Sequence, residues 1–155
     1  MPVAAPDVLS ALQRSLSLHL AAIEAYQTIS SHLARWGYSK LGSRFASEAE
    51  GERVHLRAVL SRLEYFDQGG EIAHAAPVWP RHDVPGILAA SLDLENGAAA
   101  AERNGILISR AAGDEGSALV FVELLKDSEQ TIEQITADLQ VIADVGLDNW
   151  LANLV

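Results

Sequence analysis

A Glu-x-x-His pair, Glu52 and His55, is the part of this sequence best suited to chemistry. It falls in a long stretch whose apolar residues recur every three then four positions, which predicts a helix. Residues three apart share one face of a helix, so the carboxylate and the imidazole can bind one metal ion together. A second such pair would be expected near the end of the chain, where Ser128 and Thr131 stand instead. The sequence therefore predicts half of a two-metal site.

Two more polar residues, His19 and Glu95, occupy positions of other expected helices where the pattern calls for apolar side chains. Burial of an imidazole or a carboxylate is costly unless a metal, an ion pair or protonation compensates. With Glu52 and His55 they form a set of nitrogen and oxygen ligands suited to Fe(II), Zn(II) or Mn(II). The alternative is a buried cluster held by hydrogen bonds or ion pairs alone.

Three further residues are weaker candidates. Glu48 lies one turn before Glu52 and could extend the site, and Tyr26 is placed to donate a hydrogen bond to a ligand. Glu129 lies one residue off the inward face, so it joins the site only if its helix rotates or shifts register by one residue. The remaining histidines lie off this face or in a connection and are given no metal role: His32, His74 and His82.

Four long helices are predicted to position these residues, from about Asp7 to Trp36, Lys40 to Phe66, Pro85 to Ala112 and Asp114 to Asp144. Asp7 is the expected N-cap of the first. The stretch from Gln68 to Val84 carries prolines and no periodicity, which predicts a crossover along the bundle. An apolar tail after Gly146 predicts a short fifth helix. The expected fold is all-α: one ferritin-like four-helix bundle over residues 1–155, with a long crossover between helices two and three.

The buried face of the first helix is expected to follow a regular pattern of threes and fours. Its residues are Leu9, Leu12, Leu16, His19, Ile23, Tyr26, Ser30 and Leu33. Several large apolar residues exceed what one core needs, and we expect them at subunit contacts. These are Trp36, Phe66, Trp79, Trp150, Leu151 and Leu154.

Composition excludes several classes of function. A formal net charge of −10 argues against non-specific binding to nucleic acid or to anionic membranes. The absence of cysteine excludes disulfides and thiolate metal sites, and Met1 is the only methionine. No apolar run approaches the ~18 residues of a membrane span, and no basic region precedes an apolar stretch at the N-terminus. We therefore expect a soluble, cytoplasmic protein.

The chain resembles the bacterioferritins over almost its whole length. The resemblance lies in five stretches: Leu20-Ala21-Ala22-Ile23 with Tyr26, Arg35-Trp36-Gly37, Glu52-x-x-His55, Asp93-Leu94-Glu95, and Val145-Gly146-Leu147-Asp148-Asn149-Trp150-Leu151. It implies a hollow shell of twenty-four subunits that oxidises Fe(II) at a di-iron site within each subunit and stores ferric mineral. Many bacterioferritins also hold haem between paired subunits through a methionine from each.

The chain departs from the pattern that this resemblance implies. His19 replaces the glutamate ligand of the first helix, and Ser128 and Thr131 replace the fourth-helix Glu-x-x-His. Arg53 stands at the position of the haem methionine, so haem is not expected. The ligand positions that match are Glu52, His55 and Glu95. What is left resembles a mononuclear site of two histidines and one carboxylate, with Glu95 as a further ligand.

Three functions follow from these departures. The first is an iron-storage shell subunit with a degraded ferroxidase centre and about one metal site per chain, binding iron or zinc. It would form a homo-oligomeric shell or co-assemble with a ferroxidase-competent subunit. The second is a working ferroxidase that oxidises Fe(II) with O₂ or peroxide at a modified site. The third is a structural shell protein with zinc or no metal. Whether the chain is an enzyme is therefore left open by its sequence.

Overall fold

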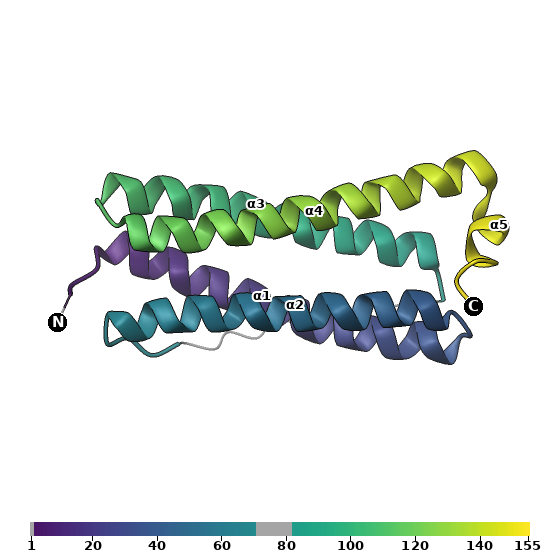
Figure 1. The fold of residues 1–155 in the computed structure, drawn as a ribbon, viewed down its shortest axis with the longest axis horizontal. Coiled ribbons are helices and arrows are strands. Elements are labelled where there is room, and N and C mark those ends of the chain that lie inside the picture. Colours follow the sequence, from purple (N-terminus) through teal and green to yellow (C-terminus); the bar gives the residue numbers. More distant parts are fainter. Residues whose placement is uncertain (1, 71–81) are drawn as a thin grey trace.

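The computed structural model describes residues 2–70 and 82–155, and its regular structure there is entirely helical. Four long helices form a bundle: α1 (Pro6–Arg35), α2 (Ser39–Tyr65), α3 (Val84–Ala111) and α4 (Glu115–Val145). The short α5 (Leu147–Leu151) turns across one end (Figure 1). The predicted all-α ferritin-like bundle with a short fifth helix is confirmed. None of the described helices is both long and apolar enough to cross a membrane.

The direction of the helices follows the expected topology. α1 and α2 are antiparallel neighbours, as are α3 and α4, and the end of α2 lies far from the start of α3 (Figure 1). A long crossover between α2 and α3 is what this arrangement requires. The central residues of the predicted crossover, 71–81, lie outside the described residues, and so do His74 and Trp79.

Local sequence explains several helix ends. The Asp83 and Asp114 side chains cap α3 and α4 by accepting a hydrogen bond from a backbone N–H three residues on, at 3.0 Å in both cases. Gly146 separates α4 from α5 with a positive φ of 85°. The predicted cap of α1 is wrong: Ala5 is the N-cap and makes no side-chain hydrogen bond, while Asp7 lies in the first turn.

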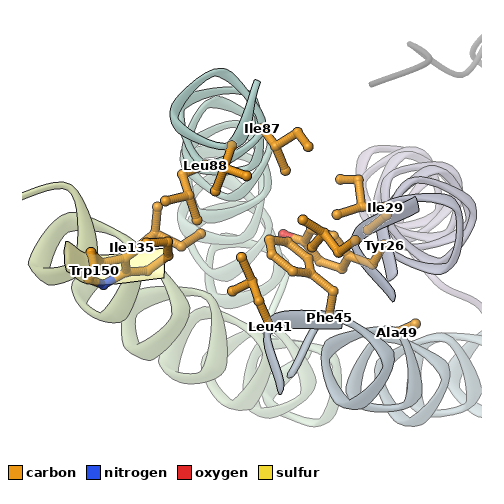
Figure 2. Packing of buried hydrophobic residues seen from close by; sticks show 12 residues of the cluster. Tyr26, Ile29, Leu41, Phe45, Ala49, Ile87, Leu88, Ile135 and Trp150 are labelled. Atoms are coloured by element: carbon orange, nitrogen blue, oxygen red, sulfur yellow. The ribbon is translucent and has the colours of Figure 1, made fainter. Parts of the chain in front are cut away.

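The apolar core is divided into two clusters. One surrounds Tyr26 and Phe45, whose ring centroids are 5.7 Å apart, and includes Trp150 of α5 (Figure 2). The other lies nearer the start of α1 and the end of α2, around Leu12 and Phe121. The middle of the bundle, between these clusters, carries the polar residues that the sequence singled out.

Two expectations about burial are corrected. On α1, Val8, Ala22 and Ile29 are buried where Leu9, Ile23 and Ser30 were expected, and those three are only partly buried. The other expected positions are buried as predicted: Leu12, Leu16, His19, Tyr26 and Leu33. Phe66 and Trp150 are only 7% and 9% exposed. They belong to the chain's own core and cannot serve as exposed contact residues. Trp36, Leu151 and Leu154 are partly buried against the cluster around Tyr26.

Candidate metal centre

A layer of buried polar side chains interrupts the core midway along the bundle. α1 contributes His19, α2 contributes Glu52 and His55, and α3 contributes Glu95 and Glu102. All five are less than 9% exposed. Because residues three or seven apart lie on one helical face, α2 and α3 each direct two of these side chains inward. Three helices thus bring ionisable groups into the space between the two apolar clusters.

His19, Glu52 and His55 form the compact part of this layer. One potential ligand atom from each lies within 4.8 Å of the others. His19 Nδ1 is 2.6 Å from Glu52 Oε2, and His55 Nδ1 is 3.7 Å from Glu52 Oε1. The two imidazole rings meet edge to face, with centroids 5.2 Å apart. Such a set of two nitrogens and a carboxylate can hold one divalent transition-metal ion.

A pocket of about 380 Å³ opens on the outer side of His55, between α2 and α4. Its walls are Glu48, Gly51, Glu52, His55, Asp127, Gln130, Thr131 and Gln134. His55 Nε2 lies 2.8 Å from Asp127 Oδ2. Since a carboxylate oxygen only accepts, Nε2 carries the hydrogen of this bond. His55 therefore lines the pocket with Nε2 hydrogen-bonded to Asp127. Its inner nitrogen, Nδ1, has no hydrogen-bond partner among the described residues.

Glu95 is held on the other side of the layer. The Tyr26 hydroxyl, fully buried, donates a hydrogen bond to Glu95 Oε1. The sequence predicted that Tyr26 donates a hydrogen bond to a candidate ligand, and its contact with Glu95 agrees with that prediction. It also provides a partner for Glu95 that does not depend on metal.

Glu102 lies seven residues after Glu95, and its neighbouring donor is the hydroxyl of the buried Ser128 on α4. The Glu102 side chain is 1% exposed, and neither carboxylate oxygen accepts a hydrogen bond of ordinary geometry within the described part of the chain. The nearest charged group is the His19 ring, with Nε2 3.7 Å from Oε1. His19 Nε2 is itself without a hydrogen-bond partner there.

Burial and neighbouring charges raise the pKa of some side chains in this layer and lower that of Glu52. Burial raises the pKa of Glu95 and of Glu102 to about 7. Burial acts the same way on Glu52, but His19 and His55 beside it outweigh that effect and lower its pKa to about 2. Burial disfavours the charged form of His55, yet the carboxylates of Glu52 and Asp127 raise its pKa to about 9. Burial also raises the pKa of Tyr26, which keeps its proton.

The weaker candidates are not gathered into the compact group. Glu48 is half-buried at the pocket, where burial raises its pKa and the Thr131 hydroxyl donates to it at 3.3 Å. Glu129 points outward: its side chain is 53% exposed and pairs with Arg103 at 2.7 Å. Ser128, and not Glu129, is the residue of this pair that α4 buries.

Sequence reasoning missed two members of the site. Glu102 was not counted among the candidates, although its spacing of seven from Glu95 puts it on the same helical face and was the available signal. Asp127 precedes Ser128 and lies off the expected face. Nothing in its spacing indicates that it reaches across to His55, because that contact depends on how α2 and α4 pack.

Comparison with known proteins agrees with this architecture. The model of the ferritin-like domain family matches residues 9–145. A bacterial ferritin of Pseudomonas aeruginosa is 33% identical, covering 94% of this chain and 95% of its own length. A bacterioferritin of Brucella melitensis is 28% identical over 94% of this chain and 90% of its own. The chain belongs to the bacterioferritin family. A bacterioferritin of Mycobacterium leprae is more distant, at 25% identity over 97% of this chain and 94% of its own.

Within the bacterioferritin family this chain combines matched and altered site positions. Glu52, His55 and Glu95, the positions that the sequence resemblance expects to match the family's ligands, all lie in the buried polar layer. Of the altered positions, His19 lies in the compact group, Ser128 is buried near Glu95 and Glu102, and Thr131 lines the pocket. The site thus has its ionisable groups on α1, α2 and α3, with Asp127 supplied by α4 from the side of the pocket.

Proposed function

We propose that this bacterioferritin is an iron-binding shell subunit that holds about one divalent ion in its bundle core and lacks a di-iron ferroxidase centre. His19, Glu52 and His55 are the ligands of that ion, and Fe(II) is the cargo. Glu95 as an additional ligand stays a prediction, since Tyr26 already engages it. Zinc, with the same preference for imidazole and carboxylate, competes for the same donors.

The observation that carries this proposal is the convergence of His19, Glu52 and His55, which each bring one potential ligand atom to within 4.8 Å of the others in the buried layer. His55 binds the Asp127 carboxylate through Nε2, an arrangement that fixes the orientation of metal-ligating histidines, and its inner nitrogen, Nδ1, has no hydrogen-bond partner among the described residues. A second iron would need carboxylate and imidazole donors from α4. Ser128 and Thr131 supply only hydroxyl groups, and the Thr131 hydroxyl already donates to Glu48.

Metal content is the direct test. Elemental mass spectrometry after anaerobic loading with Fe(II) should find about one iron per chain in the wild type. His55→Ala should lose most of that iron. His82→Ala is the matched control, because His82 is exposed and stacks on Trp36 with ring centroids 4.3 Å apart. It should keep the wild-type content.

Other metal contents would change the assignment. Two irons per chain, with rapid oxidation of Fe(II) by O₂, would contradict the loss of the di-iron centre. No iron or zinc at all would mean that hydrogen bonds and ion pairs alone hold the polar layer. Equal loss from the His82→Ala control would show that the iron is bound elsewhere.

We further propose that the subunit assembles into a closed shell, with twenty-four copies as the expected number. Several large apolar residues are exposed on the single chain, an arrangement that favours burial between subunits. They include Val54, Tyr65, Leu107 and Leu119. Sedimentation of the purified protein should give one large species. Co-expression with a ferroxidase-competent bacterioferritin and mass analysis of the product tests whether mixed shells form.

A further inference from the structure

His19 presents its two ring nitrogens to two different carboxylates. Nδ1 lies 2.6 Å from Glu52 Oε2, and Nε2, at the opposite edge of the ring, lies 3.7 Å from Glu102 Oε1. The first pair forms a hydrogen bond, whereas the second is too far apart for one. Since a carboxylate only accepts, Nδ1 carries a hydrogen in this structure. His19 and Glu102 are 2% and 1% exposed, so the protein itself must provide their partners.

Metal binding moves the hydrogen of His19 to the other nitrogen. An ion that His19 shares with Glu52 must take the ring nitrogen on the Glu52 side, which is Nδ1. A nitrogen that binds a metal gives its lone pair to the ion, so the neutral ring carries its one hydrogen on Nε2. Nε2 then becomes a buried donor, which is costly unless an acceptor faces it.

Glu102 is placed to be that acceptor. His19 Nε2 and Glu102 Oε1 face each other, and neither atom has another hydrogen-bond partner of ordinary geometry among the described residues. The neighbouring Ser128 has one hydroxyl hydrogen to donate, which leaves acceptor positions of the carboxylate open to His19. A hydrogen bond of about 2.9 Å requires the two side chains to approach by less than about 1 Å.

His55 already has the corresponding arrangement. Its Nε2 donates to Asp127 Oδ2 at 2.8 Å, while its Nδ1 lies on the side of Glu52, 3.7 Å from Oε1. Both histidines therefore turn Nδ1 toward Glu52 and Nε2 toward a second carboxylate. Histidines that bind metal commonly donate their other ring N–H to a carboxylate, which fixes the tautomer and the orientation of the ring.

We propose that Glu102 is a positioning residue of the metal site: it accepts a hydrogen bond from His19 Nε2 and so holds the tautomer that binds a divalent transition-metal ion through Nδ1. This gives the buried Glu102 a role that requires no contact with the ion. The inference rests on the proposed function, because it concerns how a ligand of the same ion is held.

Cobalt(II) titration of the metal-free assembled protein tests this role. Co(II) reports its coordination by visible absorption and takes the same ligands as Fe(II) and Zn(II). Glu102→Leu removes the acceptor and should weaken Co(II) binding about 10–100-fold. At saturation its absorption bands should keep their wild-type positions, because the ligands are unchanged. Glu102→Gln keeps an acceptor oxygen and should bind Co(II) at least about threefold more tightly than Glu102→Leu.

The control is Ser109→Ala, since Ser109 is also fully buried on α3. It should bind Co(II) within about twofold of the wild type. Shifted absorption bands in Glu102→Leu would mean that Glu102 contacts the ion directly. Equal losses in Glu102→Leu and Glu102→Gln would mean that its charge acts and not its hydrogen bond. Either result would overturn the positioning role.

The variant His19→Ala determines whether Glu102 acts through His19. It should weaken Co(II) binding and shift the bands, and adding Glu102→Leu to it should cause less than about a twofold further loss. An undiminished further loss would overturn the inference. If His19→Ala and His55→Ala weaken binding while Glu102→Leu does not, only this inference fails. If none of the three weakens it, the polar layer does not hold the metal, and both proposals fail.

The tautomer of His19 can also be observed without any change at Glu102. Solid-state nitrogen NMR of the Zn(II)-loaded protein, with its five histidines labelled, distinguishes ring nitrogens that carry a hydrogen from those that bind metal. The signals lost in His19→Ala should be a metal-bound Nδ1 and a protonated Nε2. A ring bound to Zn(II) through Nε2 would contradict the proposal, even if Glu102→Leu did not fold.

Discussion

At the scale of single residues, the opposed pKa shifts in the polar layer predict how stability depends on pH. Glu95 and Glu102, with pKa values of about 7, contribute stability that is fully present below their ordinary pKa of 4.5 and is lost as pH rises through 7. His55, at about 9, contributes stability that is present below 6.5 and is lost as pH rises through 9. Glu52, at about 2, contributes stability that is present above 4.5 and is lost as pH falls through 2.

The metal-free protein should therefore be most stable near about pH 5 and lose stability steadily to pH 9. Thermal unfolding in the presence of a chelator at pH 5, 7 and 9 measures this. In Glu95→Gln the amide cannot ionise, so the decline between pH 5 and 7 should be smaller than in the wild type. A melting temperature that rises from pH 5 to 9 would contradict the raised carboxyl pKa values.

The Tyr26 hydroxyl gives a second prediction at this scale. Tyr26→Phe leaves the ring in place but removes the hydrogen bond to the buried Glu95. An acceptor left unsatisfied in the core costs about 1–3 kcal/mol, and urea unfolding should show a loss of that size. Tyr65→Phe is the control, because Tyr65 is 54% exposed and should change stability little. Equal losses from both variants would argue against the importance of this contact.

At the scale of helices, α3 and α4 approach closely at Gly105. A Cβ atom built there would lie 2.7 Å from three atoms of the Phe121 ring. Gly105→Ala should therefore destabilise the protein by about 1–3 kcal/mol, because the ring must move within a packed core. Gly97→Ala, on the same helix with no atom within 4 Å, should stabilise it by up to about 1 kcal/mol through helix propensity. Chemical denaturation of the two variants should show opposite signs. A stabilising Gly105→Ala would mean that α3 and α4 can separate without cost.

The sequence predicts the bounds of the helices better than it predicts which face of each helix is buried. Helix ends follow local signals such as the Asp83 and Asp114 caps, so the bounds come out nearly as expected. The rotation of each helix depends on its neighbours. Burial on α1 keeps the alternation of threes and fours, but the helix is turned so that Ala22 and Ile29, rather than Ile23 and Ser30, face inward. The sequence predicted that His19, Glu52 and His55 converge, but the surroundings of Glu102, with His19 and Ser128 beside it, depend on contacts between helices.

At the scale of the whole molecule, the polar layer lies between two apolar clusters, so the proposed metal binding should affect the stability of the whole bundle. Without an ion, unpartnered groups of His19, His55 and Glu102 are buried there at a cost. An ion that binds only the folded chain stabilises it by about 2.7 kcal/mol at a free concentration one hundred times its dissociation constant.

Calorimetry should therefore find the melting temperature raised by about 5–10 °C in saturating Zn(II) over the same protein in a chelator, for a subunit of this size. The variant His55→Ala should lose most of this shift, since it removes a proposed ligand while leaving the acidic surface of the protein unchanged. Addition of Mg(II), which prefers oxygen ligands, serves as a control and should give little stabilisation. If Zn(II) raised the wild type and His55→Ala equally, its effect would come from the acidic surface of the assembly. The buried layer would then be a structural feature of the bundle rather than a place for cargo.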